Sequence, residues 1–274
     1  MLKQRLLTAA VLIPLFVWGV LALPSMYFAM LLAAVVVVAA LEWSRLVALP
    51  TTARLVFVLL IGSGLLFAMY APPPADVIRG IAATAVIWWA CATAWIYRYQ
   101  IGAQGLPKTR LGGALAGLAV LLPPWLALTA LHRDPATGPA YVLFLFVLVW
   151  AADSGAYFAG RRFGRRKVAP RVSPGKTWEG VLGGAAASLL VAVAGAFIFN
   201  IPFVVAILFV ALCVAVVVIS VVGDLLESLF KREAGVKDSG RFLPGHGGAL
   251  DRIDSITAAA PVFYVGMALI AWLT

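Results

Sequence analysis

Two segments of the sequence place carboxylates among many lysines and arginines. Residues 160–178 and 224–255 together hold more than half of the 21 basic residues of the chain. Carboxylate oxygens are ligands that Mg²⁺ prefers, and Lys and Arg side chains bind phosphate oxygens. The combination therefore predicts magnesium-dependent handling of phosphates. Six of the 11 acidic residues lie in or beside these segments: Asp153, Asp224, Glu227, Asp238, Asp251 and Asp254.

Parts of this pattern also have simpler explanations. The basic run GRRFGRRK at 160–167 is typical of a segment that anchors to anionic lipid headgroups. Asp251, Arg252 and Asp254 are compatible with a local ion-pair cluster at the start of a helix. Asp224 follows a long apolar run and is compatible with a residue that ends a helix. The clustering of acidic residues among these cations favours a phosphate site, because a patch that anchors to lipid would do better without carboxylates.

Residues Ser173–Thr177 end like the phosphate-binding motif GxxxxGK[ST]. Pro170 occupies the first glycine position of that motif, and no strand is expected before it, so the segment is not a Walker motif. Its chemistry still suits phosphate, because Lys176 supplies a positive charge. Either Ser173 or Thr177 is expected to cap the helix that follows, whose N-terminus favours an anion.

The composition indicates the kind of protein that positions these charges. Hydrophobic residues make up 64% of the chain and charged residues 12%, whereas a soluble protein carries about 25% charged residues. This leaves too little polar side chain to cover a surface in water, so we predict an all-α polytopic integral membrane protein. A spanning helix takes about 20 apolar residues. The apolar stretches predict nine spans, at about 6–23, 26–49, 54–71, 77–97, 111–131, 139–160, 179–199, 202–223 and 256–273.

The basic residues are distributed unevenly over the predicted loops. With nine spans the loops alternate between two sides, and of the 21 basic residues only Arg79 and Arg133 fall opposite the N-terminus. The positive-inside rule therefore predicts a cytoplasmic N-terminus and a C-terminus outside. Cys91 and Cys213 fall inside apolar runs and indicate no zinc site. The predicted division is a set of N-terminal membrane helices, 1–135, and a catalytic membrane region, 136–274, with cytoplasmic loops at 160–178 and 224–255.

Two stretches of the sequence resemble a known family. The residues SLFKREAGVKDSGRFLPGHGGALDRID, at 228–254, closely resemble the signature of the phosphatidate cytidylyltransferases, also called CDP-diacylglycerol synthases. The residues ADSGAYFAGRRFGRRKVAPRVSPGKTWEG, at 152–180, are similar to the bacterial members. The first five predicted spans match only in being hydrophobic. One departure is Ala249, where the family usually carries a larger aliphatic residue.

The resemblance implies that CTP reacts with phosphatidic acid to give CDP-diacylglycerol and pyrophosphate, with Mg²⁺ required. It also implies that Asp224 and Asp251 supply metal ligands, with Asp254 close by. The nucleophile would be a phosphate oxygen that is already anionic, so no serine or cysteine nucleophile and no strong base is needed. The expected catalytic residues are Asp224, Lys231, His246, Asp251 and Arg252; the expected metal ligands are Asp224, Asp251 and Asp254; and the expected substrate-binding residues are Asp153, Lys167, Ser173, Lys176, Thr177, Ser228, Arg232, Lys237 and Asp238.

The sequence does not assign individual cations to individual phosphates. His246 lies between Gly245 and Gly247, where close backbone approach or a positive φ is easy. We expect it to position a phosphate or orient a ligand rather than to act as a base. CTP is cytosolic, so the site is expected at the cytoplasmic face of a bacterial inner membrane. The candidates for the phosphates of CTP and phosphatidate are Lys176, Lys231, Arg232, Lys237 and Arg252.

Two other functions are compatible with parts of the pattern. A CTP-dependent lipid kinase also needs CTP, a metal and a membrane substrate, but it would release CDP. A transporter fits the composition, although transporters place ionisable residues near the bilayer midplane, and most predicted spans are uncharged in the middle. The expected partners are CTP, phosphatidic acid and the lipid bilayer, with no nucleic acid. The small-residue stretches 112–117 and 183–187 permit close helix packing, within one chain or in a homodimer.

Overall fold

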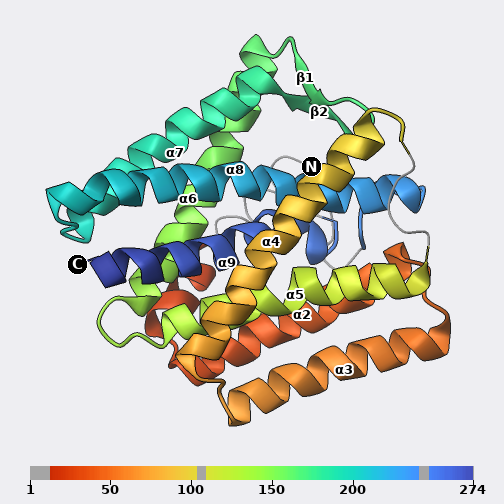
Figure 1. The fold of residues 1–274 in the computed structure, drawn as a ribbon, viewed down its shortest axis with the longest axis horizontal. Helices are drawn as coiled ribbons and strands as arrows, with labels where there is room; N and C mark the ends of the chain where they lie inside the picture. The colour runs from red at the N-terminus through yellow and green to blue at the C-terminus, as the bar shows by residue number, and fades with distance from the viewer. Residues whose placement is uncertain (1–12, 104–108, 241–246, 274) are drawn as a thin grey trace.

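The protein is a bundle of long apolar helices (Figure 1). A computed structural model describes residues 13–103, 109–240 and 247–273. Eight of the described helices are long and apolar enough to cross a membrane. The predicted class, an all-α polytopic membrane protein, is therefore confirmed. The eight are α2 (Ser25–Leu46), α3 (Thr51–Tyr70), α4 (Ala75–Gln100), α5 (Arg110–His132), α6 (Gly138–Phe163), α7 (Trp178–Ile198), α8 (Phe203–Glu233) and α9 (Leu250–Leu273).

The helix starts follow the prolines of the sequence. Pro24, Pro50, Pro74 and Pro202 directly precede α2, α3, α4 and α8. Proline has no N–H, and the first N–H groups of a helix have no partner within the helix, so it is well tolerated there. The predicted breaks at these positions are confirmed. The first predicted span, 6–23, is described only in part, as a shorter apolar helix, Ile13–Ala22.

α8 is longer than the apolar run at 202–223 that predicted it. The helix continues to Glu233, and α9 already begins at Leu250. The segment 224–255 is therefore not a loop over its whole length. The physical reason is that the last turns of α8 are amphipathic, so the mean hydropathy falls although the helix goes on.

The amphipathic end of α8 separates a polar face from an apolar one. The apolar face is buried in the core, where the ring of Phe230 lies 4.5 Å from that of Trp43 in α2. Residues spaced three and four apart share one side of a helix. The apolar side chains of these turns therefore face the core, and the polar side chains face α9. The buried apolar residues are Leu225, Leu226, Leu229 and Phe230, and the polar face consists of Asp224, Glu227, Ser228 and Lys231.

A short antiparallel hairpin joins α6 to α7 (Figure 1). Its strands are β1 (Lys167–Ala169) and β2 (Ser173–Thr177), with Lys167 opposite Thr177. The expectation that no strand precedes Ser173–Thr177 is wrong, because β1 does. The segment is still no Walker loop, since Ser173–Thr177 is itself a strand. Glu179, at the start of α7, holds the hairpin by accepting hydrogen bonds from the backbone N–H groups of Arg165 and Arg166.

The small residues at 183–187 pack α7 against α6 within one chain. A Cβ added at Gly183 would collide with Ala159, and one added at Gly184 would meet the carbonyl oxygen of Ala152. Such close backbone approach is the usual role of small residues in membrane helices. The hairpin and the last turns of α6 are thereby held next to α7.

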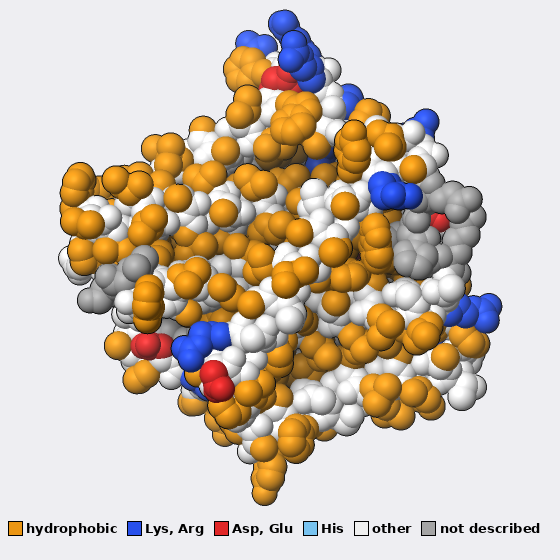
Figure 2. Space-filling view, in the orientation of Figure 1, with side chains coloured by type: hydrophobic (Ala, Val, Ile, Leu, Met, Phe, Trp, Pro, Cys, Tyr) orange, Lys and Arg blue, Asp and Glu red, His pale blue; other side chains and the backbone are white. Residues whose placement is uncertain are grey.

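Both charged segments belong to the same end of the bundle. The C-terminal ends of α2, α4, α6 and α8 all lie toward the top or the right of Figure 1. Successive helices therefore run in opposite directions, as the predicted alternation of the loops requires. In the same view, Lys and Arg side chains gather mainly along the top and right margins, while apolar side chains cover much of the face between them (Figure 2). This exposed apolar surface suits contact with lipid.

Candidate active site

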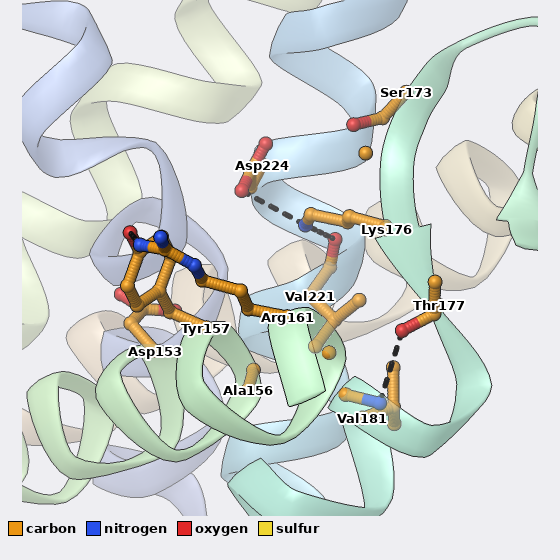
Figure 3. Close-up of a pocket in the computed structure, with 13 residues that line it drawn as sticks. Asp153, Ala156, Tyr157, Arg161, Ser173, Lys176, Thr177, Val181, Val221 and Asp224 are labelled. Carbon is orange, nitrogen blue, oxygen red and sulfur yellow. Dashed lines mark hydrogen bonds and ion pairs between the residues drawn. The ribbon is translucent and has the colours of Figure 1, made fainter. Parts of the chain in front are cut away.

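A pocket of about 530 Å³ opens between α6, the hairpin, α7 and α8 (Figure 3). Its volume lies in the range of ligand sites, about 300–1,000 Å³. Three helices and one strand contribute, so residues far apart in the sequence meet here. The polar side chains that line it are Asp153, Tyr157 and Arg161 from α6, Ser173, Lys176 and Thr177 from β2, and Asp224 from α8.

An ion pair crosses the pocket from the hairpin to α8. The Nζ atom of Lys176 lies 2.8 Å from Oδ2 of Asp224 and donates a second hydrogen bond to the carbonyl oxygen of Val221, at 3.4 Å. The hydroxyl of Ser228 donates to Oδ1 of Asp224 at 3.2 Å. The Lys176 and Asp224 side chains keep 23% and 32% of their exposure. Both charges are therefore accessible from the pocket.

Thr177 has a structural role beside the pocket. Its hydroxyl accepts a hydrogen bond from the backbone N–H of Gly180 at 3.2 Å and caps α7. The predicted cap is confirmed for Thr177, whereas Ser173 lines the pocket. On α6, Arg161 donates to the hydroxyl of Tyr157 at 3.0 Å, and both side chains lie on the wall with Asp153 (Figure 3).

A second cluster of charges lies where α8 meets α9. Lys231 Nζ lies 2.6 Å from Oδ1 of Asp251 and 3.4 Å from Oε1 of Glu227. The other oxygen of Asp251, Oδ2, accepts hydrogen bonds from Ser239 N and Oγ, both at 3.0 Å, and from Gly248 N at 2.8 Å. All four acceptor contacts of Asp251 are thus made by the last turn of α8 and the segment before α9.

The carboxylates of α8 and α9 outnumber the lysines that contact them. Glu227 is only 3% exposed, and its two oxygens accept no hydrogen bond among the described residues. Asp254 accepts the N–H of its neighbour Ser255 and lies against the carboxyl groups of Glu227 and Asp224. Buried carboxylates are costly without a compensating cation. The seam between α8 and α9 therefore brings four carboxyl groups, those of Asp224, Glu227, Asp251 and Asp254, against two lysines, Lys176 and Lys231.

The donor chemistry of this seam fits a hard divalent cation. Carboxylate oxygens are the ligands of Mg²⁺, and the carboxyl groups of Glu227 and Asp254, which lie against each other, are ones that a cation would stabilise. Within the described residues, no three Asp, Glu, His or Cys side chains converge as a metal cage. Asp224 and Asp251 each contact a lysine instead. The assignment of Asp224, Asp251 and Asp254 to a metal stays a prediction.

The remaining predicted residues lie outside the pocket. Arg232 is held by the hairpin, where its Nε donates to the carbonyl oxygen of Val172 at 3.2 Å. His246 falls outside the described residues, so the structure does not place it. The predicted site residues that are exposed to solvent at this end are Lys167, Arg232, Lys237, Asp238 and Arg252.

Sequence reasoning missed one carboxylate at this end of the bundle. Glu42 of α2 is 3% exposed and accepts hydrogen bonds from Ser239 Oγ, Ala249 N and Leu250 N. The available signal was a lone acidic residue inside the predicted span 26–49, because ionisable residues at membrane depth are usually functional. The N-terminal helices therefore contribute to the site.

Close contact between α8 and α9 depends on Gly223. A Cβ at this position would collide with the carbonyl oxygen of Asp254 and touch the Cβ of Ala258. We expect Gly223→Ala to separate the two helices and lower the free energy of unfolding by about 1–3 kcal/mol, with a matching loss of turnover. Thermal unfolding in detergent would measure this. Gly80→Ala in α4, where the added Cβ meets open space, is the matched control, and equal behaviour of the two variants would contradict the account.

Comparison with known proteins finds relatives along the whole chain. The model of the cytidylyltransferase family matches residues 3–270. A protein of Pseudomonas aeruginosa named phosphatidate cytidylyltransferase is 43% identical over 282 residues, which cover 96% of both chains. A protein of the same name from Haemophilus influenzae is 41% identical over 296 residues, covering 96% of this chain and 97% of its own. Another, from Brucella suis, is 44% identical over 170 residues, 60% of each chain.

Proposed function

Because the chain belongs to the cytidylyltransferase family, we propose that it transfers the cytidylyl group of CTP to phosphatidic acid, giving CDP-diacylglycerol and pyrophosphate. It is a nucleotidyltransferase of phospholipid biosynthesis. The structural observation that carries the proposal is the ion pair of Lys176 and Asp224, which places a cation for phosphate beside a carboxylate for a metal in one accessible pocket.

The proposed reaction is a displacement at phosphorus. A phosphate oxygen of phosphatidate forms a bond to the α-phosphorus of CTP, the bond from that phosphorus to the bridging oxygen breaks, and pyrophosphate leaves with the electron pair. The attacking oxygen is already anionic, so no general base is required. Catalysis then rests on alignment and charge neutralisation.

The residues of the pocket suit these two tasks. Lys176 and Arg161 bring positive charge to opposite walls (Figure 3), where they would bind phosphate oxygens of the two substrates. When bound, Mg²⁺ would neutralise charge on the triphosphate and on the departing pyrophosphate. Asp224, Asp251 and Asp254 are the residues proposed to hold it. Lys231 would orient Asp251 by a contact of 2.6 Å.

The placement of the site in the membrane is also part of the proposal. CTP is cytosolic, and the headgroup of phosphatidate lies at the membrane surface. The pocket is at the end of the bundle that carries most basic residues (Figure 2), which the positive-inside rule assigns to the cytoplasm. We place the protein in the bacterial inner membrane with this end inside. A homodimer stays a prediction.

The identity of the released product tests the proposal against a lipid kinase. Purified protein with CTP, Mg²⁺ and phosphatidate is expected to release pyrophosphate in an amount equal to the CTP consumed. A CTP-dependent lipid kinase would release CDP and would use a lipid alcohol such as diacylglycerol. Release of CDP, or CTP consumption that does not depend on phosphatidate, would contradict the proposed function.

A further inference from the structure

Glu42 is a buried carboxylate that belongs to α2 but binds the start of α9. Its Oε2 atom accepts hydrogen bonds from Leu250 N at 2.8 Å and Ser239 Oγ at 3.0 Å, and its Oε1 atom accepts one from Ala249 N at 3.1 Å. The two partners at 249 and 250 are about two hundred positions away in the sequence. A side chain of the N-terminal half thus reaches the segment that carries the proposed catalytic residues.

The backbone around this carboxylate is shaped to enclose it. A Cβ added at Gly240 or at Gly248 would collide with the carboxylate of Glu42. Because glycine has no Cβ, the backbone at both positions can approach the carboxylate of Glu42 this closely. Glu42 is 3% exposed, and three hydrogen bonds from described residues satisfy its oxygens, as a buried polar group requires.

The position of Glu42 also suits the field of α9. Leu250 is the first residue of that helix, and the first N–H groups of a helix have no partner within it. A negative charge at this end is stabilised by the helix dipole. Glu42 therefore does, from another helix, what a capping residue usually does from the same chain segment.

Ser239 connects Glu42 to Asp251. Its hydroxyl oxygen lies 3.0 Å from Oε2 of Glu42 and 3.0 Å from Oδ2 of Asp251. A hydroxyl has one proton, so it can donate to only one of these carboxylates at a time. Asp251 also accepts the N–H groups of Ser239 and Gly248, so residues of the same segment bind both carboxylates. A shift of the segment must move Asp251 relative to Lys231.

We propose that Glu42 is a positioning residue for the reaction: it holds Ser239, Ala249 and Leu250 so that Asp251 stays directed at Lys231 and the carboxylates of α8. The effect on turnover rests on the proposed function. The effect on the segment itself does not, because it follows from the hydrogen bonds alone. Partners that orient a ligating side chain typically change metal affinity or activity by about 10–100-fold when removed.

The test uses the full-length protein in detergent with Glu42→Gln, which keeps the size of the side chain but cannot accept all three hydrogen bonds. The matched control is Ser44→Ala, because Ser44 is equally buried in the same turn of α2 but bonds only its own helix, at Leu41 O. Two quantities are measured: hydrogen exchange of residues 247–252, and the Mg²⁺ concentration that gives half-maximal turnover. The half-activating Mg²⁺ concentration does not depend on the fraction of folded enzyme, and exchange of residues 256–263 reports global unfolding separately.

For Glu42→Gln we expect exchange of 247–252 to rise roughly tenfold or more, as for a locally opened segment, while residues 256–263 stay protected. We also expect turnover to fall by roughly 10–100-fold, with a several-fold higher half-activating Mg²⁺ concentration. Ser44→Ala should change neither quantity. Unchanged exchange at 247–252 overturns the proposal, and so does faster exchange with normal turnover and normal Mg²⁺ response.

Ser239→Ala keeps the proposal testable if Glu42→Gln is too unstable to purify. It leaves the cap of α9 intact but cuts the link to Asp251, so we expect an intermediate loss of turnover and a raised Mg²⁺ requirement. Wild-type turnover and Mg²⁺ response of this variant would contradict the claim that Ser239 links Glu42 to Asp251. If the wild-type protein shows no reaction between CTP and phosphatidate, the proposed function fails, and the exchange measurement alone then decides whether Glu42 holds the segment.

Discussion

Asp224→Asn is expected to lower turnover by roughly 10²–10³-fold, the size of effect seen when one group that stabilises transition-state charge is removed. The carboxylate lies in the pocket 2.8 Å from Lys176, and an amide can neither neutralise that lysine nor bind a metal ion well. The ion pair is partly exposed, so its loss should cost only about 1 kcal/mol of stability. Phosphatidate-dependent release of pyrophosphate and a thermal melt, measured on the same preparation, would separate the two effects.

The control for this variant is Asp76→Asn. Asp76 lies in the first turn of α4 and is exposed, at the end of the bundle opposite the pocket. It should behave like the wild-type protein in both measurements. Near-normal turnover of Asp224→Asn would remove Asp224 from the machinery. A loss of turnover that only mirrors a loss of folded protein would assign it a structural role instead.

Lys231→Met is expected to lose both turnover and stability. The lysine is 13% exposed and contacts two carboxylates that are 8% and 3% exposed, Asp251 and Glu227. Removing one partner of a buried ion pair leaves uncompensated charge and typically costs about 3–5 kcal/mol. Turnover should fall by at least the roughly 10²-fold expected for Asp224→Asn, because Asp251 loses the contact that orients it. Chemical or thermal unfolding of the purified protein, together with the pyrophosphate assay, measures both.

A double variant separates the structural part of this effect from the chemical part. Lys231→Met with Glu227→Gln removes one of the two buried charges that the single variant leaves without a lysine, that of Glu227. We expect it to recover a large part of the lost stability, since the effects of contacting residues are not additive, but not the turnover. Recovery of both would show that Lys231 serves stability alone.

Much of the site was predictable because its chemistry is local in the sequence. Asp224 and Lys176 were selected as a carboxylate and a cation near phosphate, and the structure brings them into one ion pair. The cap by Thr177 followed from a polar residue before an apolar run. The proline-defined helix starts were predictable for the same reason, because a proline acts on its own neighbours.

The features that were not predicted depend on contacts between distant elements. The last turns of α8 were taken for a loop, because a hydropathy pattern cannot distinguish a polar loop from an amphipathic helix end. The hairpin of β1 and β2 is too short for a periodic pattern. Glu42 is bound to Ala249 and Leu250, a pairing that only the folded bundle shows. Ala249 departs from the family pattern, yet it contributes its backbone N–H, which a change of side chain preserves.

The central claim is that the site transfers a cytidylyl group to phosphatidate. The most direct measurement uses CTP that is radiolabelled at either the α-phosphate or the γ-phosphate. The labelled CTP is incubated with the purified protein, Mg²⁺ and phosphatidate in detergent micelles, and the label is followed into the products. The account predicts that the α-label enters the lipid fraction and that the γ-label leaves entirely as pyrophosphate, and that Asp224→Asn loses both. Transfer of the γ-label to lipid, or no incorporation of the α-label, would contradict it.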